Sequence, residues 1–104
     1  MASTKESLER VMARLSHLEG VTHKTMMREY IIYYRDKNVG GIYDDRFLLK
    51  CTKTSCRLLP DARRESPYDG AKEMLRVDES VGSELLTELF NGMVAELPAP
   101  KKKR

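Results

Sequence analysis

The side chains of this chain best suited to metal binding or nucleophilic catalysis are its two histidines and two cysteines, His17, His23, Cys51 and Cys56. Structural zinc sites use four such side chains, usually as closely spaced pairs. The spacing here matches no such pattern, and the chain has no CxxC pair, glycine-rich phosphate loop or nucleophile elbow. Because no group of residues offers a nucleophile with a base and an oxyanion donor, we expect no enzyme activity, no metal and no cofactor.

Two neighbouring carboxylates, Asp44 and Asp45, are the remaining candidates for acid–base chemistry. Neighbouring side chains on a hairpin point apart, and aspartate is a favoured turn residue. We therefore interpret the pair as a turn between two strands.

Four of the five tyrosines lie between residues 21 and 50. Exposed tyrosines interleaved with basic residues could stack the bases of a single-stranded nucleic acid. Here Ile31 and Ile32 stand among the tyrosines, and tyrosine is itself a strand former with a large apolar body. Burial in the core is therefore the favoured interpretation.

Positive charge is concentrated at the carboxy-terminal end. Four of the nineteen basic residues lie at 101–104, so the net charge of +3 becomes −1 for residues 1–100. We expect a single domain over residues 1–100 and a disordered basic tail over 101–104. If the protein binds nucleic acid, the candidate residues are the basic side chains of region 46–76 and the tail: Arg57, Arg63, Arg64, Lys72, Lys101, Lys102, Lys103 and Arg104. Short basic runs are more often a solvated surface, so this hypothesis is the alternative one.

Composition indicates a small globular domain. The chain has 104 residues, of which 40% are hydrophobic and 34% are charged. A chain of this length buries about 60–70% of the surface that it exposes when unfolded. No run approaches the ~20 apolar residues that span a bilayer, and the first residues lack the apolar core of a signal peptide. We expect a cytoplasmic protein with no membrane partner and with reduced cysteines.

Three helices are predicted. Ser3-Thr4-Lys5-Glu6 has the spacing of a capping box, and apolar residues then follow at helical intervals up to Gly20, which predicts a helix over Thr4–Glu19. A short helix is predicted over Thr52–Leu59, where Pro60 ends it. From Asp78 or Ser80 as cap, a long helix carries the most regular stripe in the sequence: Val81, Leu85, Leu86, Leu89, Phe90, Met93, Val94 and Leu97.

Five strands are predicted as an antiparallel meander: Val21–Met27, Tyr30–Arg35, Val39–Tyr43, Arg46–Cys51 and, at an edge, Lys72–Val77. Asp36-Lys37-Asn38 suits a hairpin turn, and Asp61–Gly70 a loop. Gly40-Gly41 lies inside a strand, where glycine usually marks a bulge or the close approach of another backbone.

The second predicted strand is apolar on both faces. Tyr30, Ile32 and Tyr34 lie on one face, and Ile31 and Tyr33 on the other. We therefore expect helices on one face and another cover on the second, such as a second copy of the protein in a homodimer.

Several motifs in order resemble the amino-terminal domain of the TfoX competence regulators. They are Val21-Thr22-x-x-x-Met26, Tyr30-x-x-Tyr33-Tyr34-x-Asp36-x-x-Val39, Asp44-Asp45-x-Phe47-x-x-Lys50, Pro67-Tyr68-Asp69-Gly70-Ala71-Lys72 and Leu97-Pro98-Ala99-Pro100-Lys101. The chain departs from those proteins at Arg28, where relatives have a glycine, and at Cys51, where they often have a proline. It resembles a stand-alone relative without the carboxy-terminal domain.

The resemblance implies an α+β domain, with a curved antiparallel sheet and helices mainly on one side, and brings no catalytic residues. It further implies a non-enzymatic interaction or regulatory domain, linked to transcription of DNA-uptake genes through protein contacts. The alternative is a nucleic-acid-binding accessory protein that uses the basic residues. A shared face for Arg57, Arg63, Arg64 and Lys72 would favour this alternative.

Overall fold

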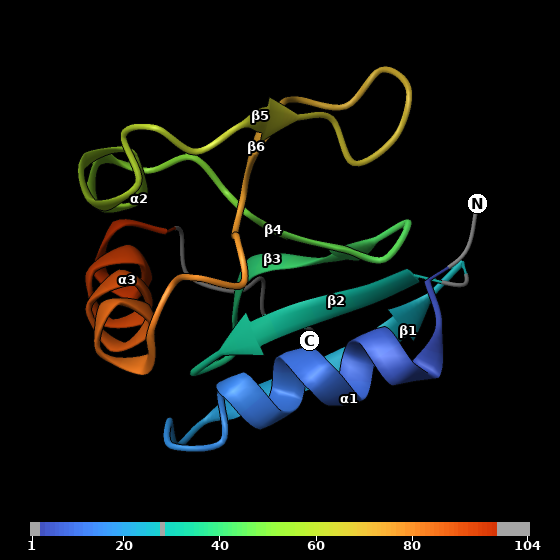
Figure 1. Ribbon diagram of the computed structural model, residues 1–104, viewed down its shortest axis with the longest axis horizontal. Helices are drawn as coiled ribbons and strands as arrows, with labels where there is room; N and C mark the ends of the chain where they lie inside the picture. Colours follow the sequence, from blue (N-terminus) through green and yellow to red (C-terminus); the bar gives the residue numbers. More distant parts are fainter. Residues whose placement is uncertain (1–2, 28, 98–104) are drawn as a thin grey trace, which may run out of the picture.

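The protein contains one antiparallel sheet (Figure 1). Its three helices lie near the start, in the middle and near the end of the chain. The computed structural model describes residues 3–27 and 29–97. Along the chain the elements are α1 (Lys5–Arg14), β1 (Val21–Met26), β2 (Glu29–Tyr34), β3 (Lys37–Tyr43), β4 (Arg46–Leu49), α2 (Lys53–Leu58), β5 (Arg64–Glu65), β6 (Met74–Arg76) and α3 (Ser83–Glu96). Arg28, Pro98, Pro100 and the predicted tail Lys101–Arg104 lie outside the described residues.

The predicted α+β class, antiparallel sheet and three helices are confirmed, but the sheet has six strands, not five. Its order is β1-β2-β3-β4-β6-β5. The additional strand, Arg64–Glu65, lies inside the predicted loop and pairs with Leu75 and Met74. The strand predicted at the edge therefore lies between two others. Two residues show no periodicity that a sequence can reveal, so only pairing with β6 defines this strand.

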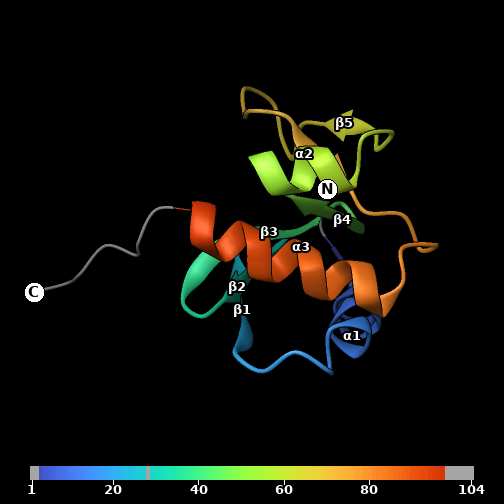
Figure 2. The same ribbon diagram turned by 90° about the vertical axis from the view of Figure 1, so that its left-hand side faces the viewer.

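The main core lies between the sheet and the helices α1 and α3, which cover the same face (Figure 2). The regular stripe of α3 supplies Leu86, Leu89, Phe90 and Met93, and Leu89 and Phe90 are 0% exposed. Tyr34 meets Phe90 edge-on, with ring centroids 5.4 Å apart. The prediction that this stripe packs on the sheet is confirmed.

The helix ends differ from the predictions. Thr4, not Ser3, caps α1, because Thr4 Oγ1 accepts from Ser7 N at 3.1 Å. The Ser3 hydroxyl is instead buried, 3.0 Å from Ile42 O. α1 ends at Arg14, before the predicted Glu19, although Gly20 has the expected positive φ of 90°. α3 begins at Ser83 after Gly82, because Asp78 accepts from Ser80 in a preceding turn.

Two tight turns connect the central strands. Asp44 and Asp45 have φ values of 55° and 62°, so the predicted two-residue turn is confirmed. The turn predicted at Asp36-Lys37-Asn38 is one residue earlier: Arg35 and Asp36 have φ values of 51° and 69°. The Arg35 guanidinium lies 5.0 Å from the centroid of the Tyr34 ring.

The glycine pair in β3 marks both a bulge and a close approach, as predicted. Ile32 pairs with Gly40 whereas Tyr33 pairs with Asn38, so Val39 is an extra residue in β3. A Cβ atom on Gly40 would stand 2.1 Å from Leu48 O. A side chain at this position therefore requires β3 and β4 to separate.

We predict that Leu89→Ala lowers the free energy of unfolding by about 2–5 kcal/mol, because it leaves a cavity in a fully buried site. Glu88→Ala, on the exposed side of the same helix, should change it by less than about 0.5 kcal/mol. Chemical denaturation measures both. Equal midpoints for the two variants would contradict the packing described here.

We predict that Gly40→Ala lowers the free energy of unfolding by about 2 kcal/mol or more, because the new Cβ meets backbone rather than a movable side chain. Gly82→Ala is the matched control, since nothing lies within 4 Å of a Cβ at that position. Thermal melting of the two variants is the measurement. A Gly40→Ala protein that melts like the control would show that β3 is not held this close to β4.

Candidate functional site

The face of the sheet opposite α1 and α3 carries a second, smaller apolar cluster. Ile31, Tyr43, Leu48 and Met74 are buried there, and Tyr33 is packed against them. The segment between β5 and β6 supplies part of the cover, since the rings of Tyr68 and Tyr43 lie 6.3 Å apart. The expectation that something other than a helix covers this face is thus met in part by the chain itself.

Beside this cluster lies a groove of about 980 Å³, here called the open-face groove. Its lining residues are Met26, Met27, Glu29, Ile31, Tyr33, Asn38, Tyr43, Lys50, Cys51, Pro67, Tyr68, Ala71, Lys72, Glu73 and Met74. Three large apolar side chains around it are exposed: Met26 by 56%, Met27 by 89% and Tyr68 by 65%. Exposed apolar side chains that gather at a groove are typical of a contact surface.

Tyr43, Cys51 and Asn38 are among the polar residues of the open-face groove. Burial first, then Tyr68 and Glu29, raises the pKa of Tyr43. Burial first, then Cys56, raises the pKa of the Cys51 thiol, so Cys51 stays protonated at neutral pH and is a poor nucleophile. The side-chain oxygen of Asn38 is buried and accepts no hydrogen bond from the described residues.

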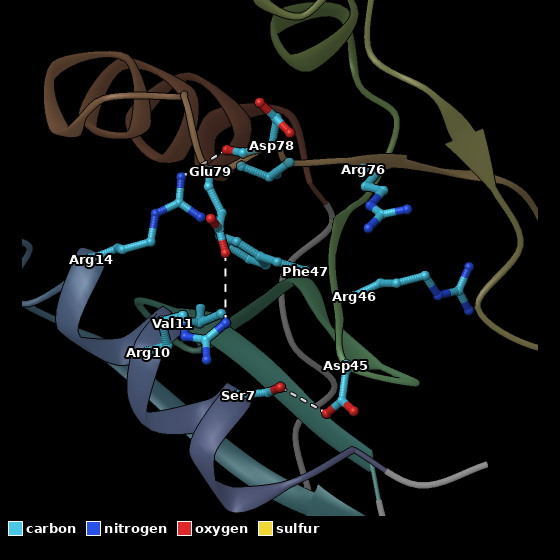
Figure 3. Close-up of a pocket in the computed structure, with 11 residues that line it drawn as sticks. Ser7, Arg10, Val11, Arg14, Asp45, Arg46, Phe47, Arg76, Asp78 and Glu79 are labelled. Carbon is cyan, nitrogen blue, oxygen red and sulfur yellow. Dashed lines mark hydrogen bonds and ion pairs between the residues drawn. The ribbon is translucent and has the colours of Figure 1, made fainter.

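A smaller hollow of about 190 Å³ lies between α1, β4 and the segment after β6 (Figure 3). Here called the arginine hollow, it is lined by Ser7, Arg10, Val11, Arg14, Asp45, Arg46, Phe47, Arg76, Val77, Asp78 and Glu79. Its polar groups already bind one another. Arg14 Nη2 donates to Asp78 O and Val81 O at 2.9 Å, and Arg10 lies 3.6 Å from Glu79.

Asp45 is the most heavily used acceptor of the arginine hollow. Its carboxylate accepts from Thr4 N and from Ser7 Oγ, each at 2.7 Å. These bonds, the one from the Thr4 backbone first, hold the pKa of Asp45 below its usual range. Asp45 therefore ties the β3–β4 turn to the start of α1. Because Asp45, Arg14 and Arg10 contact other groups of the chain in this way, the arginine hollow stabilises the fold.

An ion-paired group connects β4, β5 and β6 on the open face of the sheet. Glu65 lies 2.6 Å from Arg46 Nη1 and 3.3 Å from Arg76 Nη1. The hydrogen bond from Arg46, and then the one from Arg76, hold the pKa of Glu65 below its usual range. This group fixes the two-residue strand β5 to its neighbours.

The basic residues predicted for nucleic-acid binding do not share one site. Lys72 lines the open-face groove, whereas Arg63 lines a different hollow with Asp61, Arg76 and Asp78. Arg64 Nη2 lies 3.6 Å from Cys56 Sγ, and Arg57 is an exposed residue of α2. Lys101, Lys102, Lys103 and Arg104 lie outside the described residues.

The two histidines contact different parts of the chain, and neither contact involves a cysteine. His17 Nε2 lies 2.7 Å from Thr87 Oγ1, the ring of His23 meets that of Tyr30 at 6.3 Å, and both cysteines are free thiols. Over residues 3–27 and 29–97, no three His, Cys, Asp or Glu side chains are placed to hold a metal ion. No helix in this part of the chain is long and apolar enough to cross a membrane.

The fold defines an α+β domain with an open antiparallel sheet. A search of family models and of solved structures found no match. An uncharacterized 12.7 kDa protein in the trpE 5′ region of Spirochaeta aurantia is 34% identical over 80 residues, which cover 76% of this chain and 70% of that protein. The chain belongs to the same family as this spirochaete protein.

Much of the open-face groove was missed by sequence analysis. The alternation of β2 did place Ile31 and Tyr33 on a second apolar face. The sequence predicts that Tyr43 is buried in the core, without saying on which face of the sheet, and that Tyr68 lies in the loop Asp61–Gly70. No periodicity connects Tyr68 and Met74 with β2, because they reach the groove through the return of the chain after β5. Two neighbouring methionines, Met26 and Met27, at the end of the first predicted strand were the available signal.

We predict that Glu65→Gln lowers the free energy of unfolding by about 1 kcal/mol at pH 7, because it removes the negative partner of two arginines. Glutamate in an unfolded chain titrates near about pH 4.3, and the folded pKa of Glu65 is lower. The stabilisation is therefore complete above the unfolded value and is lost as the pH falls through the folded one.

Urea denaturation of wild type and Glu65→Gln at pH 7 and at pH 3 measures this effect. The difference between the two proteins should shrink at pH 3. Glu79→Gln is the control, since Glu79 forms an exposed pair with Arg10. A difference that is the same at both pH values would contradict the role assigned to Glu65.

Proposed function

We propose that this protein is a non-enzymatic interaction domain that binds a protein partner through the open-face groove. The observation that carries the proposal is the gathering of exposed Met26, Met27 and Tyr68 around an apolar groove of about 980 Å³. Removal of such side chains from water contributes about 25 cal/mol per Å² of apolar area, which is the main source of affinity in protein contacts.

The chemistry of the groove favours a protein partner. Three of its lining residues are methionines, whose flexible, polarizable side chains adapt to apolar surfaces of different shape. The charged lining residues are Lys50, Lys72, Glu29 and Glu73, so the two signs balance. A balanced surface attracts a phosphate backbone weakly. The free acceptor on Asn38 suits a backbone N–H of a bound segment.

The resemblance to the amino-terminal domain of the TfoX regulators gives this interaction a context. We propose that the protein acts in the cytoplasm, in the regulation of transcription of DNA-uptake genes, through contact with another protein. The groove contains Tyr33, Pro67, Tyr68 and Lys72, which belong to the motifs of that resemblance. These motif residues would then serve recognition rather than only the fold.

Nucleic-acid binding is the weaker alternative. One observation favours it: Lys24 Nζ lies 5.8 Å from the centroid of the Tyr33 ring, and Tyr33 lines the groove together with Lys50 and Lys72. Aromatic rings flanked by lysines can stack bases of a single strand. Arg63 lines a different hollow from Lys72, which speaks against one broad basic interface.

We predict that Tyr68→Lys, which removes an exposed aromatic ring and adds a charge, abolishes partner binding without unfolding the protein. The measurement is affinity purification of the tagged protein after crosslinking in its own cells, followed by mass spectrometry. Glu88→Gln, on the exposed side of α3, is the matched control, because it also changes the net charge by +1. The expected result is one set of proteins retained by wild type and control but at least tenfold depleted with Tyr68→Lys.

Two outcomes would contradict the proposal. The first is the recovery of the same proteins with Tyr68→Lys as with wild type. The second is the loss of all retained proteins after nuclease treatment, which would mean that nucleic acid bridges them and would favour the alternative function.

A further inference from the structure

The outer strand β1 has an open edge. β1 stands at one end of the strand order and pairs only with β2 among the described strands. Of its six residues, all but Val21 are exposed. Figure 2 shows β1 at the lower margin of the sheet, with α1 and α3 to one side of it. The strand contains no proline and no bulge, which are two of the means of preventing an edge from pairing with another strand, and Lys24 is its one charged residue.

The register shows which backbone groups of β1 face outward. Arg35 N donates to Gly20 O at 2.9 Å, so Gly20 and Arg35 form a hydrogen-bonded pair. Such pairs alternate along an antiparallel ladder, which places Thr22, Lys24 and Met26 in the pairs that bond to β2. The N–H and C=O groups of Val21, His23 and Thr25 therefore point away from β2.

We propose that two copies of this protein associate by antiparallel pairing of their β1 strands about a twofold axis at His23. In this register His23 pairs with His23 of the second copy, and Val21 pairs with Thr25. All three outward residues of each strand then find partners, in about six N–H···O bonds. The inference does not depend on the proposed function, because Val21, His23 and Thr25, whose outward backbone groups would pair, are not among the lining residues of the open-face groove.

Charge distinguishes this register from its neighbours. With the axis at His23, Lys24 lies opposite Thr22 of the second copy, so the strand's lysines do not face each other. Moving the axis to Lys24 would place two lysines directly opposite, which is destabilising. Moving it to Thr22 would leave Thr25 without a partner. The register at His23 thus gives the most bonds without a repulsive pair.

Pairing at β1 would join the two sheets into one. Directly paired residues in an antiparallel ladder share a face, so the open faces of both copies would lie on the same side. Two open-face grooves on one surface could then bind two segments of one partner, with a gain in avidity from the second contact. A six-residue edge buries less than a standard interface, so we expect a dissociation constant of about 1–100 μM.

The first test is sedimentation velocity of the full chain from about 1 μM to 1 mM, with wild type, His23→Pro and His23→Thr. Wild type should pass from monomer to dimer over this range. His23→Pro should dimerise at least tenfold more weakly, since it removes an outward N–H that β2 does not use. His23→Thr keeps this N–H and should dimerise as wild type does. Tyr68→Lys, a groove variant, should also remain dimeric.

The second test fixes the register and needs no proline. Paired residues across a hydrogen-bonded position have Cα atoms about 5.5 Å apart, which suits a disulfide. His23→Cys should therefore form a disulfide-linked dimer upon mild oxidation. Lys24→Cys should crosslink much less, because the two positions lie diagonally, about 7–8 Å apart. Wild type controls for Cys51 and Cys56.

A wild-type protein that remains monomeric at 1 mM would overturn the proposal. A dimer that His23→Pro leaves unchanged and that His23→Cys fails to crosslink would also overturn it, because the copies would then meet at another surface. Efficient crosslinking of Lys24→Cys in place of His23→Cys would refute this register.

Discussion

The bulge at Val39 in β3 is the feature on which both faces of the sheet depend. Strict alternation would place Val39 and Ile42 on opposite faces, yet both are buried in the core under the helices. The extra residue shifts the alternation, so that Lys37 also lies on the helix face and Asn38 on the open face. Gly40 and Gly41 make the shift sterically feasible, because neighbouring backbones occupy the space of their side chains.

Each consequence of the bulge connects β3 to another part of the molecule. Lys37 Nζ donates to Val94 O and Leu97 O, which are carbonyls at the end of α3. α3, which has no basic residue in its last turn, thus receives a positive charge from the sheet. Asn38 on the other face brings to the open-face groove a side-chain oxygen that accepts no hydrogen bond from the described residues. A single insertion therefore secures the long helix and shapes the groove.

The two faces of the sheet differ in how completely the chain covers them. Apolar packing of the helices covers the helix face. Asp45 in the β3–β4 turn accepts hydrogen bonds from Thr4 and Ser7 and so holds the start of α1. On the open face, the described part of the chain provides the segment between β5 and β6 as cover, and the Glu65 ion pairs hold the start of this segment in place. The exposed residues of the open face and the outer edge of β1 are the two surfaces at which we propose contacts with other molecules.

The sequence by itself determined the features that local patterns control. Four residues of the predicted stripe, Leu86, Leu89, Phe90 and Met93, are buried, because period 3.6 puts them on one side of a helix. The aspartates at 44 and 45 fit a turn that needs positive φ. Only the tertiary structure decided the rest. α1 ends at Arg14 although apolar residues continue in helical spacing to Leu18, because packing and turn geometry override weak propensity. Three features depend on how distant segments return to the sheet: the strand at Arg64, the contact of Tyr68 with Tyr43, and the placement of Arg63 and Lys72 in different hollows. No local pattern records that path.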